Sequence, residues 1–163
     1  MPASLLKHPP PGLFVSRREA YFDDMDGLWI MHHSRHVMHL ERAQMQMFDT
    51  IMETGGFDPV KFPDAYVVVK NIDIHFDEPL DAIGPFLISL QVARLREAGL
   101  TLRFGFHSAD GKRLFAHGTR TVCKLSAATK QPAGWTPLFR ERYSAWEAAA
   151  RDLPPLAGTP RKR

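Results

Sequence analysis

Residues 34–54, with the sequence SRHVMHLERAQMQMFDTIMET, form the most strongly patterned segment of this 163-residue chain. At about 100° per residue, a helix would gather the apolar side chains of this segment into one stripe. The stripe contains Val37, Leu40, Gln44, Met47, Phe48 and Ile51, and is widened by Met45 and Met52. Ser34 is a suitable N-cap, and Gly55 and Gly56 are expected to end the helix. The segment therefore predicts one long amphipathic helix.

The segments around this helix have the alternation and the β-branched content of strands. They are residues 13–22 before the helix and 66–76, 86–97, 100–108 and 113–125 after it. Gly99 and the Asp110-Gly111 pair supply tight turns, which make neighbouring strands antiparallel. Residues 137–151 predict a short second helix that begins near Pro137. One apolar helix beside an antiparallel sheet requires the sheet to wrap around it, so the expected class is α+β.

The chain length suits one domain with a substantial core but is short for two domains. The proline-rich ends, residues 1–12 and 152–163, lack hydrophobic periodicity. We predict a flexible N-terminal tail over 1–12, a domain over 13–151 and a flexible basic tail over 152–163.

Composition argues against several classes of partner. The net charge of +3 is too small and too diffuse to predict nucleic-acid binding. No stretch approaches the ~18 apolar residues of a membrane span, and the first residues lack the pattern of a signal peptide. The single cysteine, Cys123, excludes an internal disulfide and a multi-cysteine zinc site. We therefore expect a cytoplasmic protein that has neither a membrane nor a nucleic acid as partner.

Four histidines near the start of the long helix raise the question of a metal site. His32, His36 and His39 are spaced to share one side of a helix, away from the apolar stripe. A metal would need further ligands from elsewhere, and no motif supplies them. We predict that these three histidines form a solvated face and that the protein holds no metal.

The loop before the helix completes a recognisable pattern. Its parts are Tyr21, then Asp24, Met25 and Asp26, then His33, and finally Leu40, Glu41, Arg42 and Ala43. This spacing resembles the opening of the hotdog-fold 4-hydroxybenzoyl-CoA thioesterase and acyl-CoA thioesterase family. Residues 70–92 (KNIDIHFDEPLDAIGPFLISLQV) and 107–125 (HSADGKRLFAHGTRTVCKL) resemble its later strands and closing hairpin. The resemblance implies an antiparallel sheet wrapped around one central helix, and hydrolysis of acyl-CoA to free acid and CoA without a cofactor.

The resemblance also implies catalytic roles. Asp26 matches the carboxylate that attacks the thioester or activates water, although a loop cap is its alternative role. The backbone N–H at His33 would polarise the carbonyl from the helix N-terminus. The His33 side chain is expected to face inward, either orienting water or Asp26 or serving a structural role. Glu41 falls in the apolar stripe and is expected to be buried, either paired structurally or catalytic, as in one branch of hotdog thioesterases.

Four further residues are candidate substrate contacts. Tyr21 belongs to the loop motif, where it could equally fix the loop. Trp29 stands where the family usually has glycine, and Gly27 is expected to supply the flexibility of the loop instead. Arg94 and Arg96 match the region where basic residues of the family meet the CoA nucleotide, although a solvated strand face would explain them as well.

Hotdog subunits usually pair, so the resemblance implies a homodimer or homotetramer with its sites at the subunit interface. Exposed edge strands favour such pairing on physical grounds. Two alternatives to a thioesterase stay open. One is a dehydratase or hydratase of acyl thioesters, whose D-x-N-P-x-H-like segment is missing here. The other is a non-catalytic acyl-CoA-binding protein, which the departure at Trp29 would suit.

Overall fold

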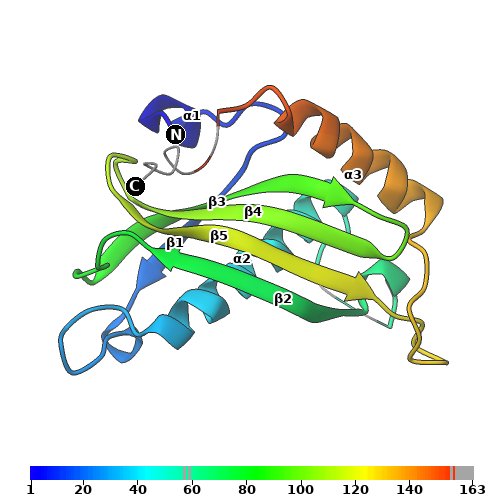
Figure 1. The fold of residues 1–163 in the computed structure, drawn as a ribbon, viewed down its shortest axis with the longest axis horizontal. Coiled ribbons are helices and arrows are strands. Elements are labelled where there is room, and N and C mark those ends of the chain that lie inside the picture. The colour runs from blue at the N-terminus through cyan, green and yellow to red at the C-terminus, as the bar shows by residue number, and fades with distance from the viewer. Residues whose placement is uncertain (57, 59, 155, 157–163) are drawn as a thin grey trace, which may run out of the picture.

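A long helix lying across an antiparallel sheet dominates the structure, a computed structural model that describes residues 1–56, 58, 60–154 and 156 (Figure 1). Within these residues five strands form one sheet in the order β1-β3-β4-β5-β2, with antiparallel neighbours throughout. The strands are β1 (Phe14–Ala20), β2 (Val67–Phe76), β3 (Gly84–Leu95), β4 (Gly99–Ser108) and β5 (Leu114–Lys124). The helices are α1 (Ala3–Lys7), α2 (His33–Met52) and α3 (Pro137–Ala150), with 3-10 turns at Phe22–Asp24 and Pro63–Ala65. The predicted α+β architecture is confirmed.

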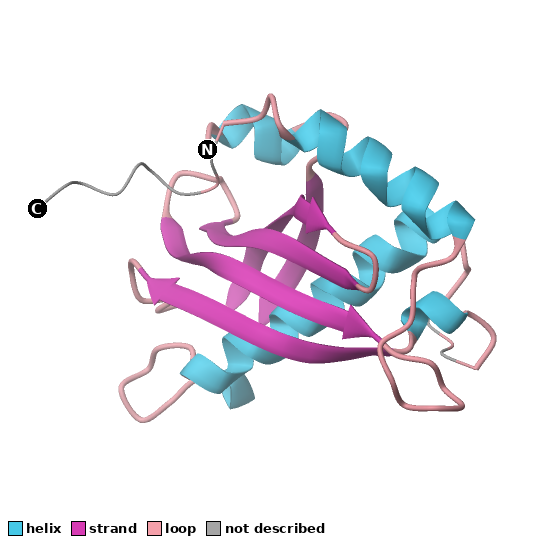
Figure 2. Ribbon diagram, turned by 45° about the vertical axis from the view of Figure 1, so that its right-hand side comes forward, coloured by secondary structure: helices cyan, strands magenta, loops and turns pink. Residues whose placement is uncertain are grey.

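Helix α2 lies across one face of the sheet (Figure 2) and packs its apolar residues against it. Leu40, Ala43 and Met47 are fully buried there. The helix begins one residue earlier than predicted, because His32 rather than Ser34 is its N-cap and the His32 ring accepts a hydrogen bond from the Ser34 N–H at 3.3 Å. It ends before the two glycines, because Glu53 itself adopts the left-handed conformation with φ 55°.

The buried face of α2 differs from the predicted stripe at its N-terminal half. His36 and His39 are buried, so the prediction that they lie on a solvated face is wrong. Glu41 is exposed on 58% of its side chain, so the prediction that it is buried is wrong as well. The physical reason is that the loop before α2 covers the helix and provides Asp24 as a buried partner for His39. The buried face of α2 therefore includes both histidines beside Leu40 and Ala43.

The ends of the chain are partly ordered against the domain. Helix α1 lies within the predicted N-terminal tail, and its Leu6 is buried beside Gly111 of the β4–β5 turn. Of the predicted C-terminal tail, residue 155 and residues 157–163 lie outside the described residues, whereas Leu156 is buried. The domain boundaries stay predictions. None of the described helices combines the length and the apolar character that crossing a membrane requires.

Candidate active site

Asp26 organises the loop that leads into α2. Its Oδ1 accepts hydrogen bonds from the backbone N–H groups of Leu28 at 2.8 Å and Ile30 at 3.3 Å. Its own backbone pairs with that of Ile30 at 2.9 Å, which closes the loop. Among the described residues no donor reaches Oδ2. The same carboxylate therefore shapes the loop with one oxygen and leaves the other free for chemistry.

Trp29 stands in this loop at the position where the thioesterase pattern usually has glycine. Its backbone has φ 62°, a left-handed conformation that suits glycine and is unusual for a bulky residue. Gly27 does not adopt a positive φ, so Trp29 itself makes the left-handed turn, and the expectation that Gly27 supplies the flexibility stays a prediction. The Trp29 ring is half exposed and packs edge-on against Phe22 with 5.6 Å between centroids. The loop thus keeps a left-handed turn at this position despite the large side chain.

The N-terminus of α2 meets Asp26 in a pocket, called here the loop pocket. Its lining comprises Asp26, Ile30, Met31, His33, His36, Phe76, Asp77, Glu78, Pro79 and Leu80. His33 is the first residue of α2, so its N–H has no partner within the helix. No acceptor elsewhere among the described residues forms a hydrogen bond with this N–H. The His33 side chain is exposed, so the prediction that it faces inward is wrong. The pocket nevertheless unites a carboxylate oxygen and a helix N-terminus, the two groups predicted to act together.

A buried pair, Asp24 and His39, joins the loop to the helix. His39 Nε2 lies 3.1 Å from Asp24 Oδ2, which also accepts a hydrogen bond from the Tyr21 N–H at 3.0 Å. Burial raises the pKa of Asp24, but the hydrogen bonds from Tyr21 and His39 outweigh it, so this pKa lies below its usual value. Burial lowers the pKa of His39, and Asp24 opposes that shift only in part. A neutral His39 that donates to an ionised Asp24 therefore anchors the loop.

His36 and His107 are buried as neutral rings. Burial lowers the pKa of His36 to about 4, and His36 lies between Phe76 and Phe106, with 5.1 Å to each ring centroid. Burial likewise lowers the pKa of His107 to about 4, where Ser89 Oγ lies 2.8 Å from its Nε2. Both rings therefore resist protonation in the folded state.

Stability should accordingly depend on pH. The pKa values of His36 and His107 in the folded protein lie below the ordinary 6.5. As the pH falls from 6.5 to about 4, these two histidines therefore bind protons in the unfolded chain but stay neutral in the folded chain. We expect the free energy of unfolding to be greatest above pH 6.5 and to fall by a few kcal/mol toward pH 4. Urea unfolding at a series of pH values measures this slope. His107→Gln should reduce it, and a slope that survives unchanged in His36→Phe/His107→Gln would refute the assignment.

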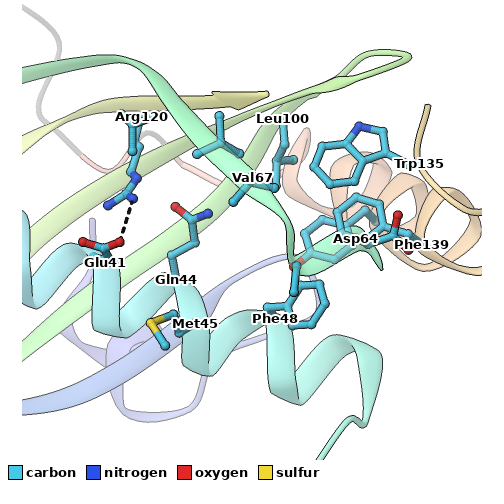
Figure 3. Close-up of a pocket in the computed structure, with 14 residues that line it drawn as sticks. Glu41, Gln44, Met45, Phe48, Asp64, Val67, Leu100, Arg120, Trp135 and Phe139 are labelled. Atoms are coloured by element: carbon cyan, nitrogen blue, oxygen red, sulfur yellow. Dashed lines mark ion pairs between the residues drawn. The ribbon is translucent and has the colours of Figure 1, made fainter. Parts of the chain in front are cut away.

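Glu41 lies in a different pocket, called here the helix pocket (Figure 3). There its Oε1 is 3.8 Å from Nη2 of Arg120, a residue of β5 that is buried to all but 3%. Arg120 was not among the residues predicted from the sequence. A usable signal was present, because Arg120 is in phase with the buried Ala116 and Val122 along the alternating strand.

The remaining predicted contacts lie apart from Asp26. Arg94 and Arg96 are exposed at the far end of β3, and Arg94 lies about 33 Å along the strand from Gly84, which pairs with Ala20 just before the loop. Tyr21 is exposed, its hydroxyl lies 3.4 Å from Glu19, and it does not line the loop pocket. Across the described residues, no three His, Cys, Asp or Glu side chains gather closely enough to hold a metal ion.

Comparison with known proteins places the fold. No protein-family model matches the chain, and no curated protein matches it. A 1,4-dihydroxy-2-naphthoyl-CoA thioesterase from Synechocystis superposes with a TM-score of 0.67 at 14% identity, over 87% of this chain and 98% of that one. A hypothetical protein from Staphylococcus aureus in complex with CoA gives 0.75 at 12% identity, over 91% and 90%. A thioesterase from Thermus thermophilus, complexed with coenzyme A and Zn, gives 0.68 at 19% identity, over 82% and 94%. The chain therefore has the hotdog fold of these thioesterases.

Proposed function

We propose that the protein is an acyl-CoA thioesterase, which hydrolyses an acyl-CoA to the free acid and CoA. The loop pocket is the observation on which this rests, because Asp26 and the start of α2 both line it. Among the described residues, one carboxylate oxygen of Asp26 and the N–H of His33 have no hydrogen-bond partner. Similarity in fold to thioesterases and to a CoA complex supports the choice of substrate.

In the proposed reaction the thioester carbonyl oxygen accepts a hydrogen bond from the His33 N–H. The partial positive charge of the α2 N-terminus then stabilises the negative charge that develops on this oxygen. Asp26 either attacks the carbonyl carbon through Oδ2 or removes a proton from the water that attacks it. Collapse of the tetrahedral intermediate breaks the C–S bond. In the general-base route the CoA thiolate takes the proton that Asp26 removed from water, and the free acid leaves directly. In the nucleophilic route the thiolate takes a proton from solvent, and water then hydrolyses the mixed anhydride formed on Asp26, which releases the acid and restores the carboxylate.

The site is proposed to be completed by a second protomer in a homodimer or homotetramer. Strand β2 forms one edge of the sheet and exposes Val68, Val69 and Phe76. An edge of this kind is a natural surface for pairing with another copy. Because Arg94 and Arg96 lie far from Asp26 of their own protomer, we propose that they meet CoA phosphates bound at another protomer.

The other predicted site residues take subordinate roles in this proposal. Tyr21 and Trp29 are proposed to contact the substrate on the outer side of the loop, where both are exposed. Glu41 lies outside the loop pocket of its own protomer and pairs with Arg120, so the structural role is the better supported one. We also propose that the protein is cytoplasmic.

Release of free thiol from a panel of acyl-CoAs tests the proposal. We expect release from at least one short, medium or aromatic acyl-CoA at a rate well above the spontaneous rate. A change in enoyl-CoA absorbance without thiol release would instead indicate a hydratase. Acyl-CoA binding without turnover of any member would indicate a binding protein, and either result would overturn the proposed activity.

A further inference from the structure

Arg120 is a buried cation whose hydrogen-bonding capacity is largely unused. Its Nε and Nη1 are shielded from solvent and have no acceptor among the described residues. Its contact with Glu41 spans 3.8 Å, which is long for a charge-assisted hydrogen bond. Burial lowers the pKa of Arg120, and Glu41 opposes this only in part. Because a buried, poorly paired charge is unfavourable, this arrangement calls for an anionic partner.

The other acidic groups of the helix pocket do not supply that partner. Asp64 is buried, but its carboxylate is occupied by Lys124 Nζ at 3.5 Å and by the N–H of Thr136 at 3.0 Å. Glu41 keeps 58% of its side chain exposed, so water screens its charge. An oxygen that entered the pocket would therefore meet no competing carboxylate at Nε or Nη1 of Arg120 among the described residues.

The rest of the pocket suits an apolar body attached to that oxygen. One wall consists of stacked rings, with 4.1 Å between the centroids of Trp135 and Phe139 and 4.0 Å between those of Phe139 and Tyr143. Val67 and Leu100 add aliphatic surface, as Figure 3 shows. The cavity between these side chains has a volume of about 110 Å³ and is open to solvent.

Gln44 lies beside Arg120 in the lining of this pocket (Figure 3). Its Oε1 is buried and also lacks a donor among the residues described. A glutamine side chain on a helix surface turns readily between rotamers. Rotation of Gln44 would open the guanidinium to a ligand without moving the backbone.

We propose that the helix pocket binds the acyl part of the substrate and that Arg120 pairs with a second carboxylate on that acyl group. The inference rests on the proposed thioesterase function and makes the preferred substrates carboxyacyl-CoAs. The loop and helix pockets follow one another along α2 and β2: Phe76 lines the first, and Val67 and Val69 line the second. Glu41 is eight residues, or about 12 Å, along α2 from His33, so the acyl chain must be long enough to bridge this interval.

The test compares matched pairs of substrates over a range of chain lengths. Each pair consists of an acyl-CoA that ends in a carboxylate and one of the same length that ends in a methyl group. At the best length, kcat/KM of the wild-type protein should be at least about tenfold higher for the carboxylate, the effect of one charged hydrogen bond. Arg120→Gln should abolish this preference by lowering kcat/KM for the carboxylate partner toward the value for the methyl partner. Arg120→Lys, which keeps the charge but loses the planar fork, should retain part of it.

Arg103→Gln, an exposed arginine on the neighbouring strand, is the matched control and should change neither substrate. Thermal unfolding establishes that the Arg120 variants are folded, and Arg120→Lys replaces Arg120→Gln if the latter is not. The inference is wrong if the wild-type protein shows no preference, or if the preference survives undiminished in Arg120→Gln or, where that variant does not fold, in Arg120→Lys.

Calorimetric titration with free α,ω-dicarboxylic acids separates this inference from the proposed function. If no acyl-CoA is hydrolysed but a diacid binds the wild-type protein and not the Arg120 variant, the pocket assignment stands and the thioesterase proposal fails. If acyl-CoAs are hydrolysed without a preference and no diacid binds, the thioesterase proposal stands and the role of Arg120 fails.

Discussion

Asp26→Asn is expected to lower kcat for thioester hydrolysis by about 10²–10⁴-fold, the usual contribution of a positioned acid–base group. The substitution changes little else, because an Asn Oδ1 can accept the same two hydrogen bonds from the Leu28 and Ile30 N–H groups. What it removes is the negative charge and the basicity of the free oxygen. KM should therefore stay within a few-fold of the wild-type value, as expected when an interaction specific to the transition state is lost.

Steady-state kinetics on the best substrate from the panel measures this effect. Asp23→Asn is the matched control, because Asp23 lies exposed in the same loop segment and should retain full activity. The melting temperature of each variant should match that of the wild-type protein. An Asp26→Asn variant that keeps more than about a tenth of the wild-type kcat would fall outside the expected range and would exclude Asp26 as the catalytic carboxylate.

Asp64→Ala should destabilise the fold by about 3–5 kcal/mol, because it leaves a buried lysine without its counter-charge. Asp64 and Lys124 are both buried and lie 3.5 Å apart, while Lys124 Nζ also donates to the Gly134 carbonyl oxygen. Asp64 further accepts a short hydrogen bond of 2.5 Å from Thr136 Oγ1. Since Thr136 caps α3, with Phe139 N–H donating to it at 3.3 Å, the loss would reach the packing of α3 as well.

Urea unfolding at neutral pH measures the loss. Asp73→Ala serves as the control, because Asp73 is exposed on β2 and lies 3.5 Å from the equally exposed His75, so its removal should cost less than about 1 kcal/mol. Adding Lys124→Met to Asp64→Ala should restore part of the stability, since the double variant no longer buries an unpaired charge. Equal, small effects of the two aspartate substitutions would show that the buried pair contributes little.

The elements of the fold were predictable because each has a strong local signal. The 3.6-residue period of residues 34–54, the alternation of the later strands and the Asp110-Gly111 turn all act over short distances. Pro137 begins α3 as expected, with Thr136 as its cap. Boundaries moved by a residue or two where a side chain outside the pattern took the capping role, as His32 did.

Charged and polar side chains at the boundary between helix and sheet were not predictable in the same way. A helical period defines a stripe but does not reveal which neighbours lie beside its edges. His39 is buried because Asp24 offers it a hydrogen bond, whereas Glu41 is exposed. These outcomes depend on contacts between residues far apart in the sequence.

The two chemical groups of the loop pocket could be predicted from the sequence, but the residues that form its opposite wall could not. The spacing of Asp26 and His33 places a carboxylate beside the start of a helix, and both line the pocket. The opposite wall comes from Phe76 and the four residues that follow it, which only the path of β2 brings near. The helix pocket likewise takes its lining from β5 and α3 as well as α2, so its walls emerge only from the assembled fold.

Product analysis tests the central claim, hydrolysis of an acyl-CoA at the loop pocket, most directly. Mass spectrometry of an acyl-CoA incubated with the wild-type protein should show free acid and CoA in equal amounts, and Asp26→Asn should leave the acyl-CoA largely intact under the same conditions. Intact acyl-CoA after incubation with the wild-type protein, a hydrated or dehydrated thioester, or equal cleavage by the two proteins would contradict the account.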